Sequence, residues 1–260
     1  MEKINLGLQV HSVREAFAED PVKTIERIAA MGYEGVELNL GALNHEPQFY
    51  ADALNRFGIK CFSAMGGMGQ FSKENLENTV ATCRILGITD IVLGSVDGNR
   101  LRNEPDYPAI AIAHMNYANE ELEKVGIRTG YHSHDMDSFR VEPDKSFYEM
   151  VMENTPDRFC MVVDTGNTMG GGDDPIALLK KFPGRSPILH IKGYSQAKGY
   201  TTPVWESEAD MDELLTTAID KCGTKTMVIE FGKRGDYEPF DRAEKSLIWL
   251  KETLARLGRI

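Results

Sequence analysis

The sequence predicts a single (β/α)₈ barrel that spans residues 1–260. Three observations point to it. Short apolar runs alternate strictly with helix-like segments, which implies a parallel sheet. Eight such units in about 250 residues is the usual size of a closed barrel. An open doubly wound sheet would need a Gly-rich phosphate turn after the first run, and the stretch "GLQVHSV" is not one. No linker or low-complexity segment divides the chain, so we expect one domain.

The expected strands are short and rich in apolar residues, as parallel strands buried on both faces are. Each is followed by a segment with helical periodicity. In chain order the expected strands cover residues 4–9, 35–39, 60–65, 90–95, 128–133, 158–164, 187–192 and 226–231.

Glycines mark the ends of four expected helices. Each glycine closes a helix-like segment and precedes a large apolar residue and a strand-like run, which is the usual place of a left-handed helix cap. These glycines are Gly32, Gly58, Gly87 and Gly126. The recurrence of this arrangement predicts a series of similar α/β units.

Three expected helices have recognisable starts. Asp20 followed by Pro21 predicts an N-cap and a first-turn proline. Asp210 with Glu213 resembles a capping box, and Ser72 is typical of an N-cap before a hydrophobic face.

The composition argues against several classes of protein. The chain has 29 Lys and Arg against 40 Asp and Glu, a net charge of −11, whereas nucleic-acid binders usually carry a basic face. No apolar run is long enough for a signal peptide or a membrane span. The four cysteines stand far apart without a CxxC pair, which is typical of buried thiols in a reducing compartment. We therefore expect a cytoplasmic protein that binds neither nucleic acid nor membrane.

Polar residues gather where the expected strands end, and in such barrels the chemistry lies at the carboxyl ends of the strands. Side chains two residues apart share a face, so His132 and His134 should point the same way, as should His190 and Lys192. In chain order the candidates are His11, Glu37, His132, His134, Asp164, Asn167, His190, Lys192 and Glu230.

Four of these residues together predict a site for one divalent metal ion. They are His132, Asp164, His190 and Glu230. Each alone is compatible with an ordinary structural role, but an Asp, a His and a Glu from three consecutive strands beside a further imidazole form a joint pattern. Mixed oxygen and nitrogen ligands suit Mn²⁺, Co²⁺, Fe²⁺ or Zn²⁺ better than Ca²⁺. Because no thiolate is present, we expect Mn²⁺ rather than a structural zinc, with Mg²⁺ a further alternative.

Five stretches are similar to segments of the sugar phosphate isomerase/epimerase family, the xylose-isomerase-like TIM barrels. Their order and spacing make the resemblance specific, and it runs nearly end to end. The stretches are "GLQVHSVREAFAEDPVKTIERIAAMGYEGVEL", "GYHSHDMDSF", "VVDTGNTMGGGDDP", "HIKGYS" and "KSLIWLK".

The resemblance implies a metal held by residues on strands five to eight, commonly Glu, Asp, His and Glu. Asp164, His190 and Glu230 match the last three. The first position departs from the family, because His132-Ser133-His134 stands where members have Glu-x-His. Either His132 replaces the glutamate as a ligand, or water or substrate takes its place.

The resemblance also implies isomerisation or epimerisation of a sugar, keto-sugar or sugar phosphate through an enediolate, within carbohydrate metabolism. Glu230 is then expected to be both ligand and base, His134 to act in proton transfer or substrate binding, and Lys192 to stabilise the developing oxyanion. The residues expected to contact the carbohydrate are His11, Glu37, Asn167 and Trp205.

Three functions other than isomerase or epimerase were considered for such a barrel. Lyases and dehydratases acting on inososes, dehydroshikimate or keto-sugars share the same first step and resemble the chain equally well. A DNA-repair endonuclease would need ligands for three zinc ions and a basic face, but the chain has six histidines and a net charge of −11. A non-catalytic sugar-binding barrel is favoured by the missing carboxylate on strand five. A homo-oligomer is compatible with the sequence.

Overall fold

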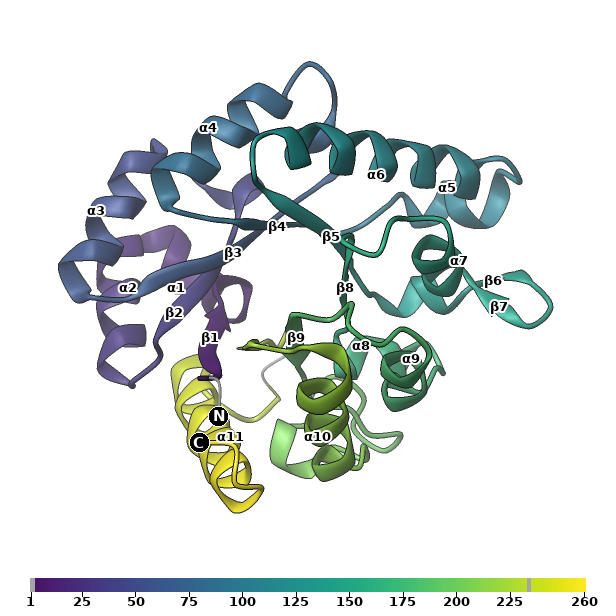
Figure 1. Ribbon diagram of the computed structural model, residues 1–260. Helices are drawn as coiled ribbons and strands as arrows, with labels where there is room; N and C mark the ends of the chain where they lie inside the picture. Colours follow the sequence, from purple (N-terminus) through teal and green to yellow (C-terminus); the bar gives the residue numbers. More distant parts are fainter. Residues whose placement is uncertain (1–2, 233–234) are drawn as a thin grey trace.

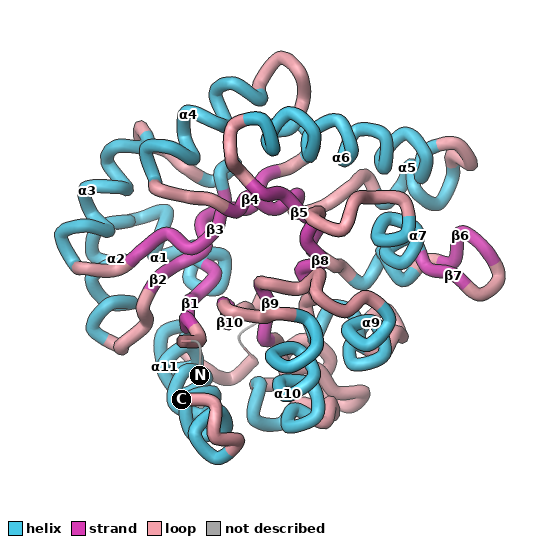
Figure 2. Tube along the Cα trace, in the orientation of Figure 1, coloured by secondary structure: helices cyan, strands magenta, loops and turns pink. Residues whose placement is uncertain are grey.

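The computed structural model describes residues 3–232 and 235–260. Eight parallel strands form an inner ring, with the helices outside it (Figures 1 and 2). The predicted (β/α)₈ barrel is thereby confirmed. Its strands are β1 (Asn5–Gln9), β2 (Gly35–Asn39), β3 (Lys60–Gly66), β4 (Asp90–Leu93), β5 (Arg128–His132), β8 (Cys160–Val162), β9 (Ile188–Ile191) and β10 (Thr226–Ile229).

The barrel closes along a seam between β8 and β9. The strand ladder runs β8-β5-β4-β3-β2-β1-β10-β9, so these two strands are its ends. Across the seam the backbone N–H of His190 donates to the carbonyl of Val163 at 2.9 Å, and that of Met161 donates to Arg185 at 2.6 Å. Asp164 and His190 form an isolated parallel bridge there. Two of the expected metal ligands therefore lie on the seam itself.

The helices cover the outside of the strand ring and bury an apolar layer against it (Figure 2). They are α1 (Arg14–Glu19), α2 (Pro21–Ala30), α3 (Pro47–Phe57), α4 (Leu76–Leu86), α5 (Gly98–Asn103), α6 (Tyr107–Lys124), α7 (Phe147–Glu153), α8 (Thr165–Gly170), α9 (Pro175–Lys181), α10 (Met211–Cys222) and α11 (Pro239–Arg256). A second, smaller apolar cluster comes from strand residues and their neighbours: Val92, Cys160, Val162, Ile188 and Val228.

The predicted strands all exist, and the largest errors are at their carboxyl ends. The strand expected over 158–164 is only Cys160–Val162, because Asp164 already caps the following helix. The hairpin of β6 (Arg140–Glu142) and β7 (Lys145–Ser146) was not predicted. It projects from the barrel beside α7 (Figure 1) and joins its strands through the short turn Pro143–Asp144.

Most of the predicted helix boundaries are confirmed. Asp20 accepts a hydrogen bond from the N–H of Lys23 at 2.9 Å, and Asp210 accepts one from Glu213 at 3.0 Å. Ser72 was wrongly predicted as an N-cap: α4 begins four residues later, and Ser72 instead ends the 3₁₀ helix η3 (Met68–Phe71). The four expected cap glycines all have positive φ, namely Gly32, Gly58, Gly87 and Gly126.

Two expectations from composition can be compared with the structure. All four cysteines are free and buried, as predicted. Among residues 3–232 and 235–260, no helix combines the length and the apolar character that crossing a bilayer requires. The cytoplasmic location stays a prediction.

Gly130 is one position of the barrel wall where a side chain does not fit. It pairs with Cys160 of β8, and a Cβ added there would overlap both the carbonyl oxygen and the side chain of that cysteine. We expect Gly130→Ala to lower the free energy of unfolding by about 1–3 kcal/mol, because overpacking forces the two strands apart. Urea unfolding followed by circular dichroism measures the change.

Gly69→Ala is the matched control. A Cβ at Gly69 meets no atom within 4 Å, and its φ is not positive. This variant should keep the wild-type stability or gain up to about 1 kcal/mol. Equal losses in the two variants would contradict the steric argument.

Candidate metal centre

Four buried side chains converge at the carboxyl end of the barrel. His132 is the last residue of β5, Asp164 follows β8 and caps α8, His190 lies in β9, and Glu230 comes directly after β10. Each offers one nitrogen or oxygen atom, and these atoms all lie within 4.8 Å of one another. The structure therefore brings together all four residues that the sequence predicted as metal ligands.

The distances between these atoms suit a small divalent ion. His132 Nε2 lies 3.1 Å from His190 Nδ1, 3.5 Å from Asp164 Oδ2 and 3.6 Å from Glu230 Oε2. Glu230 Oε2 lies 2.7 Å from His190 Nδ1. Four ligands placed tetrahedrally at about 2.1 Å from an ion are about 3.4 Å apart. The donor set therefore needs little movement to surround such an ion.

Asp164 presents one oxygen that nothing in the described chain satisfies. Its Oδ1 accepts the N–H of Asn167 at 2.7 Å, as the N-cap of α8, and its own N–H donates to Ser133 Oγ at 2.8 Å. Its Oδ2 is buried without a hydrogen-bond partner among the described residues. Its contacts there are long, at 3.5 Å to His132 Nε2 and 3.5 Å to the Lys192 ammonium. A buried carboxylate oxygen without a hydrogen bond is the observation that favours a cation at this point.

Glu37 stands behind His190. Its Oε1 lies 2.9 Å from His190 Nε2 and accepts a hydrogen bond from Gln9 Nε2 at 2.6 Å, while its Oε2 accepts one from Ser63 at 2.5 Å. The side chain is fully buried. Both of its oxygens are engaged inside the barrel and it does not line the cavity beside the cluster, so the expected contact between Glu37 and a substrate stays an untested prediction.

Lys192 lies on the other side of the cluster. Its ammonium is 3.1 Å from Glu230 Oε1 and 3.5 Å from Asp164 Oδ2. Thr165 fixes the backbone of Lys192 in both directions: its Oγ1 accepts the N–H of Lys192 at 2.9 Å and donates to the carbonyl at 2.7 Å. His190 and Lys192 thus reach the same site, as strand alternation predicted.

These charges shift one another strongly. Burial would lower the pKa of His190, but the carboxylates of Glu37 and Glu230 raise it to about 10. Burial and the neighbouring His190 oppose protonation of His132, yet its bonds to Asp164 and Glu230 leave its pKa raised. Burial would raise the pKa of Glu230, but Lys192 and the two imidazoles hold it well below its usual range.

The balance of charge suits a divalent cation. With both imidazoles neutral, the carboxylates of Glu37, Asp164 and Glu230 exceed the single ammonium of Lys192 by two charges. Ligand imidazoles must be deprotonated at the coordinating nitrogen, so an ion would take the place of protons that the cluster otherwise holds. The residues present therefore fit a divalent metal ion.

A cavity of about 290 Å³ opens beside the cluster and includes Glu230 in its wall. His134 also lines it, and its ring centroid is 4.8 Å from that of His132. Burial, followed by the nearby His132, lowers the pKa of His134 to about 4. The remaining lining residues are Gln9, His11, Asn39, Met65, Gly66, Gly67, Gly94 and Ser95.

The other residues predicted to contact substrate fall in different places. His11, in the 3₁₀ helix η1 (Val10–Val13), lines the cavity. Asn167 does not: its side-chain amide donates to the carbonyl of Ser133 at 3.1 Å and holds the loop after β5. Trp205, in η5 (Val204–Glu206), packs edge-on against Tyr237 with ring centroids 5.5 Å apart. Contact between Trp205 and a substrate stays a prediction.

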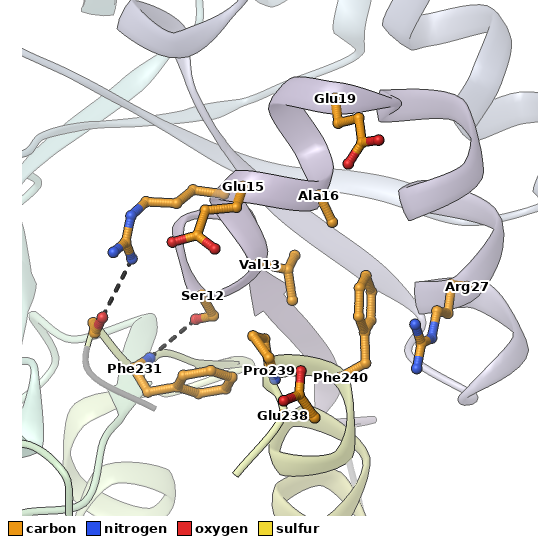
Figure 3. A pocket seen from close by; sticks show the side chains of 12 residues that line it. Ser12, Val13, Glu15, Ala16, Glu19, Arg27, Phe231, Glu238, Pro239 and Phe240 are labelled. Carbon is orange, nitrogen blue, oxygen red and sulfur yellow. Dashed lines mark hydrogen bonds between the residues drawn. The ribbon is translucent and has the colours of Figure 1, made fainter. Parts of the chain in front are cut away.

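A larger hollow of about 530 Å³ lies between α1 and the start of α11 (Figure 3). Ser12 Oγ accepts the N–H of Phe231 at 3.0 Å (Figure 3). Arg14 donates to the carbonyl of Gly232 at 3.2 Å. None of the four clustered residues lines it. We therefore assign the chemistry to the smaller cavity.

Sequence reasoning missed the residues that hold the ligands in place. Gln9, Ser63 and Ser133 make buried hydrogen bonds to Glu37 or Asp164. Ser133 lies between the two histidines, and Gln9 ends the first strand, so both had a signal in their position. Ser63 lies within an apolar run and gave none.

Solved structures with the same fold are known. A sugar phosphate isomerase/epimerase from Parabacteroides distasonis is 19% identical, with a TM-score of 0.78 over 97% of this chain and 98% of that chain. A D-allulose 3-epimerase from a Methylomonas species is 13% identical, with a TM-score of 0.69 over 98% and 99%. The IolI protein with a bound zinc atom is 13% identical, with a TM-score of 0.68 over 98% and 99%.

At these identities the matches establish a shared fold. The resemblance to the sugar phosphate isomerase/epimerase barrels that the sequence predicted is confirmed at that level. No protein-family profile and no curated protein matches the sequence.

The unsatisfied oxygen of Asp164 makes it the most direct test of metal binding. Asp164→Asn keeps the oxygen that caps α8 but replaces the ligand oxygen with an amide. We expect metal-free wild-type protein to bind one Mn²⁺ in isothermal titration calorimetry, and the variant to bind it at least about tenfold more weakly.

Asp210→Asn is the matched control, because Asp210 caps α10 in the same manner but lies on the surface. Its Mn²⁺ affinity should equal that of the wild type. If Asp164→Asn also bound Mn²⁺ with wild-type affinity, the cluster would not be the metal site.

Proposed function

We propose that this protein is a metal-dependent isomerase or epimerase of a sugar or related keto-sugar, acting by removal of a proton next to a carbonyl. The observation that carries the proposal is the buried cluster of His132, Asp164, His190 and Glu230 at the carboxyl end of the barrel, with a cavity beside it. Similar folds in a D-allulose 3-epimerase and an L-ribulose 3-epimerase support the same class of substrate.

A divalent ion in this cluster would supply a Lewis acid that polarises the carbonyl of the substrate. We infer Mn²⁺ as the resident ion, because the donors are carboxylate oxygens and imidazoles without a thiolate. Zinc, as in the IolI structure, is the first alternative.

Glu230 is the proposed base. Its two oxygens face different partners: Oε2 points to the imidazoles of the cluster, and Oε1 lies 3.1 Å from the Lys192 ammonium. The residue also lines the cavity, so one carboxylate can reach both the cluster and a substrate carbon. The nearby Lys192 ammonium supplies positive charge where negative charge develops on the substrate oxygen.

His134 is the proposed second group. Epimerisation removes a proton from one face of a carbon and returns one to the other face, so it needs two groups across the substrate. His134 and Glu230 both line the cavity, whereas His132 is turned into the cluster. His11 is the proposed contact for a substrate hydroxyl on the β1 side.

A lyase or dehydratase is the second candidate. The same buried cluster and cavity suit the first step of a lyase equally well. A lyase needs the same proton removal but expels a leaving group afterwards. The products of turnover separate the two classes, since a dehydratase releases water and an epimerase returns an isomer of equal mass.

Glu230→Gln tests the proposed function. In deuterium oxide with saturating Mn²⁺, wild-type protein should exchange the α-proton of an accepted keto-sugar or inosose, detected by proton NMR. Loss of the base should slow this exchange by about 10²–10⁴-fold. Glu206→Gln, a surface glutamate paired with Lys198, should exchange at the wild-type rate.

Parallel measurement of bound manganese separates loss of the base from loss of the metal. If Glu230→Gln retained normal exchange while His134→Ala lost it, the base would be His134. If wild-type protein held manganese but exchanged no proton across a panel of keto-sugars and inososes, the isomerase proposal would fail.

A further inference from the structure

Glu37 is a buried carboxylate placed behind a metal-ligand histidine rather than in the cavity. It is fully buried in the middle of β2. Gln9 and Ser63 donate to its two oxygens from the neighbouring strands, so its orientation is fixed from both sides. The cationic partner within ion-pair distance is His190, whose Nε2 lies 2.9 Å from Oε1.

An imidazole can present only one nitrogen to a metal, and the other then carries the proton. In His190 the nitrogen that faces the cluster is Nδ1, 3.1 Å from His132 Nε2 and 2.7 Å from Glu230 Oε2. Nε2 is on the far side, against Glu37. A carboxylate behind a ligand histidine fixes both its tautomer and the orientation of its ring.

The contact is an ion pair whose N–H is not aligned for a straight hydrogen bond. Hydrogen bonds from Gln9 and Ser63 hold the carboxylate of Glu37 in its orientation. The constraint therefore acts on the imidazole and not on Glu37.

The other imidazole of the cluster is held differently. His132 Nδ1, its far nitrogen, is buried with no hydrogen-bond partner in the described part of the chain. Neither far nitrogen has an aligned hydrogen bond among the described residues, but His190 Nε2 has a carboxylate oxygen 2.9 Å away. The contact with Glu37 therefore restrains the ring of His190, and no such contact restrains the ring of His132.

We propose that Glu37 is a positioning residue that holds His190 as the Nδ1 ligand of the metal, through the chain Gln9–Glu37–His190. The inference rests on the proposed metal site and adds a residue that touches neither the ion nor the substrate. It predicts that altering Glu37 changes how the metal is bound, whereas a purely structural role would change only the stability of the fold.

Cobalt is the probe, because its visible absorption reports the number and type of its ligands. Metal-free wild type, Glu37→Gln and Glu149→Gln are each titrated with Co²⁺ and unfolded in urea. Glu37→Gln keeps the size of the side chain but loses its charge. We expect Co²⁺ affinity to fall by about 10–100-fold, together with a changed cobalt spectrum.

Glu149→Gln is the matched control, since it makes the same chemical change in a partly buried glutamate that caps α7 and belongs neither to the cluster nor to the cavity wall. It should lose some urea resistance but keep the wild-type spectrum and bind Co²⁺ more tightly than Glu37→Gln. Wild-type affinity and spectrum in Glu37→Gln would overturn the inference and leave the metal site standing. Failure of wild-type protein to bind Co²⁺ would overturn both.

A second measurement needs no variant, in case Glu37→Gln does not fold. Long-range ¹H–¹⁵N NMR of the histidine rings in Zn²⁺-loaded wild-type protein reports which nitrogen carries the proton. We expect His190 to be protonated at Nε2, with that proton protected from exchange by its contact with Glu37. Coordination of zinc through Nε2 of His190 would contradict the proposed role.

Discussion

Burial of negative charge at the mouth of the barrel is the constraint on which the rest of the site depends. Glu37, Asp164 and Glu230 are all withdrawn from solvent, and an unpaired buried carboxylate is strongly unfavourable. The ammonium of Lys192 and two imidazoles lie against these carboxylates and compensate their negative charge. A site of this kind is stable only with cations in it, whether they are protons or a metal ion.

Strand alternation explains why so few residues build so dense a network. Alternate residues of a strand share a face, so His190 in β9 and Lys192, the residue after this strand, both contact Glu230. The adjacent strand β10 adds Glu230 from the residue after its end, and Glu37 comes from β2, which β1 and β10 separate from β9 in the ladder. The polar groups that orient them, such as Thr165, come from the first turn of the helix that follows a strand.

The sequence allowed us to predict the order of strands and helices and the four convergent ligands. Hydrophobic periodicity and position near a strand end can both be recognised in the sequence alone. What Glu37 and Asn167 do was not predictable. Glu37 lies in the middle of β2 and Asn167 in the first turn of α8, and whether such a side chain faces the cavity or the back of a ligand depends on the stagger between strands. For Trp205, in an irregular loop, periodicity carried no information, and its place against Tyr237 depends on tertiary packing.

The seam between β8 and β9 has a consequence for the dynamics of the molecule. It is the one place in the described strand ring where no continuous ladder joins neighbouring strands, and Asp164 and His190 face each other across it. Segments with few shared backbone bonds open most readily, well below the cost of global unfolding. A metal ion bound by both Asp164 and His190 would link the two strands across this seam. Local opening of the barrel wall at the seam and release of the ion would then occur together.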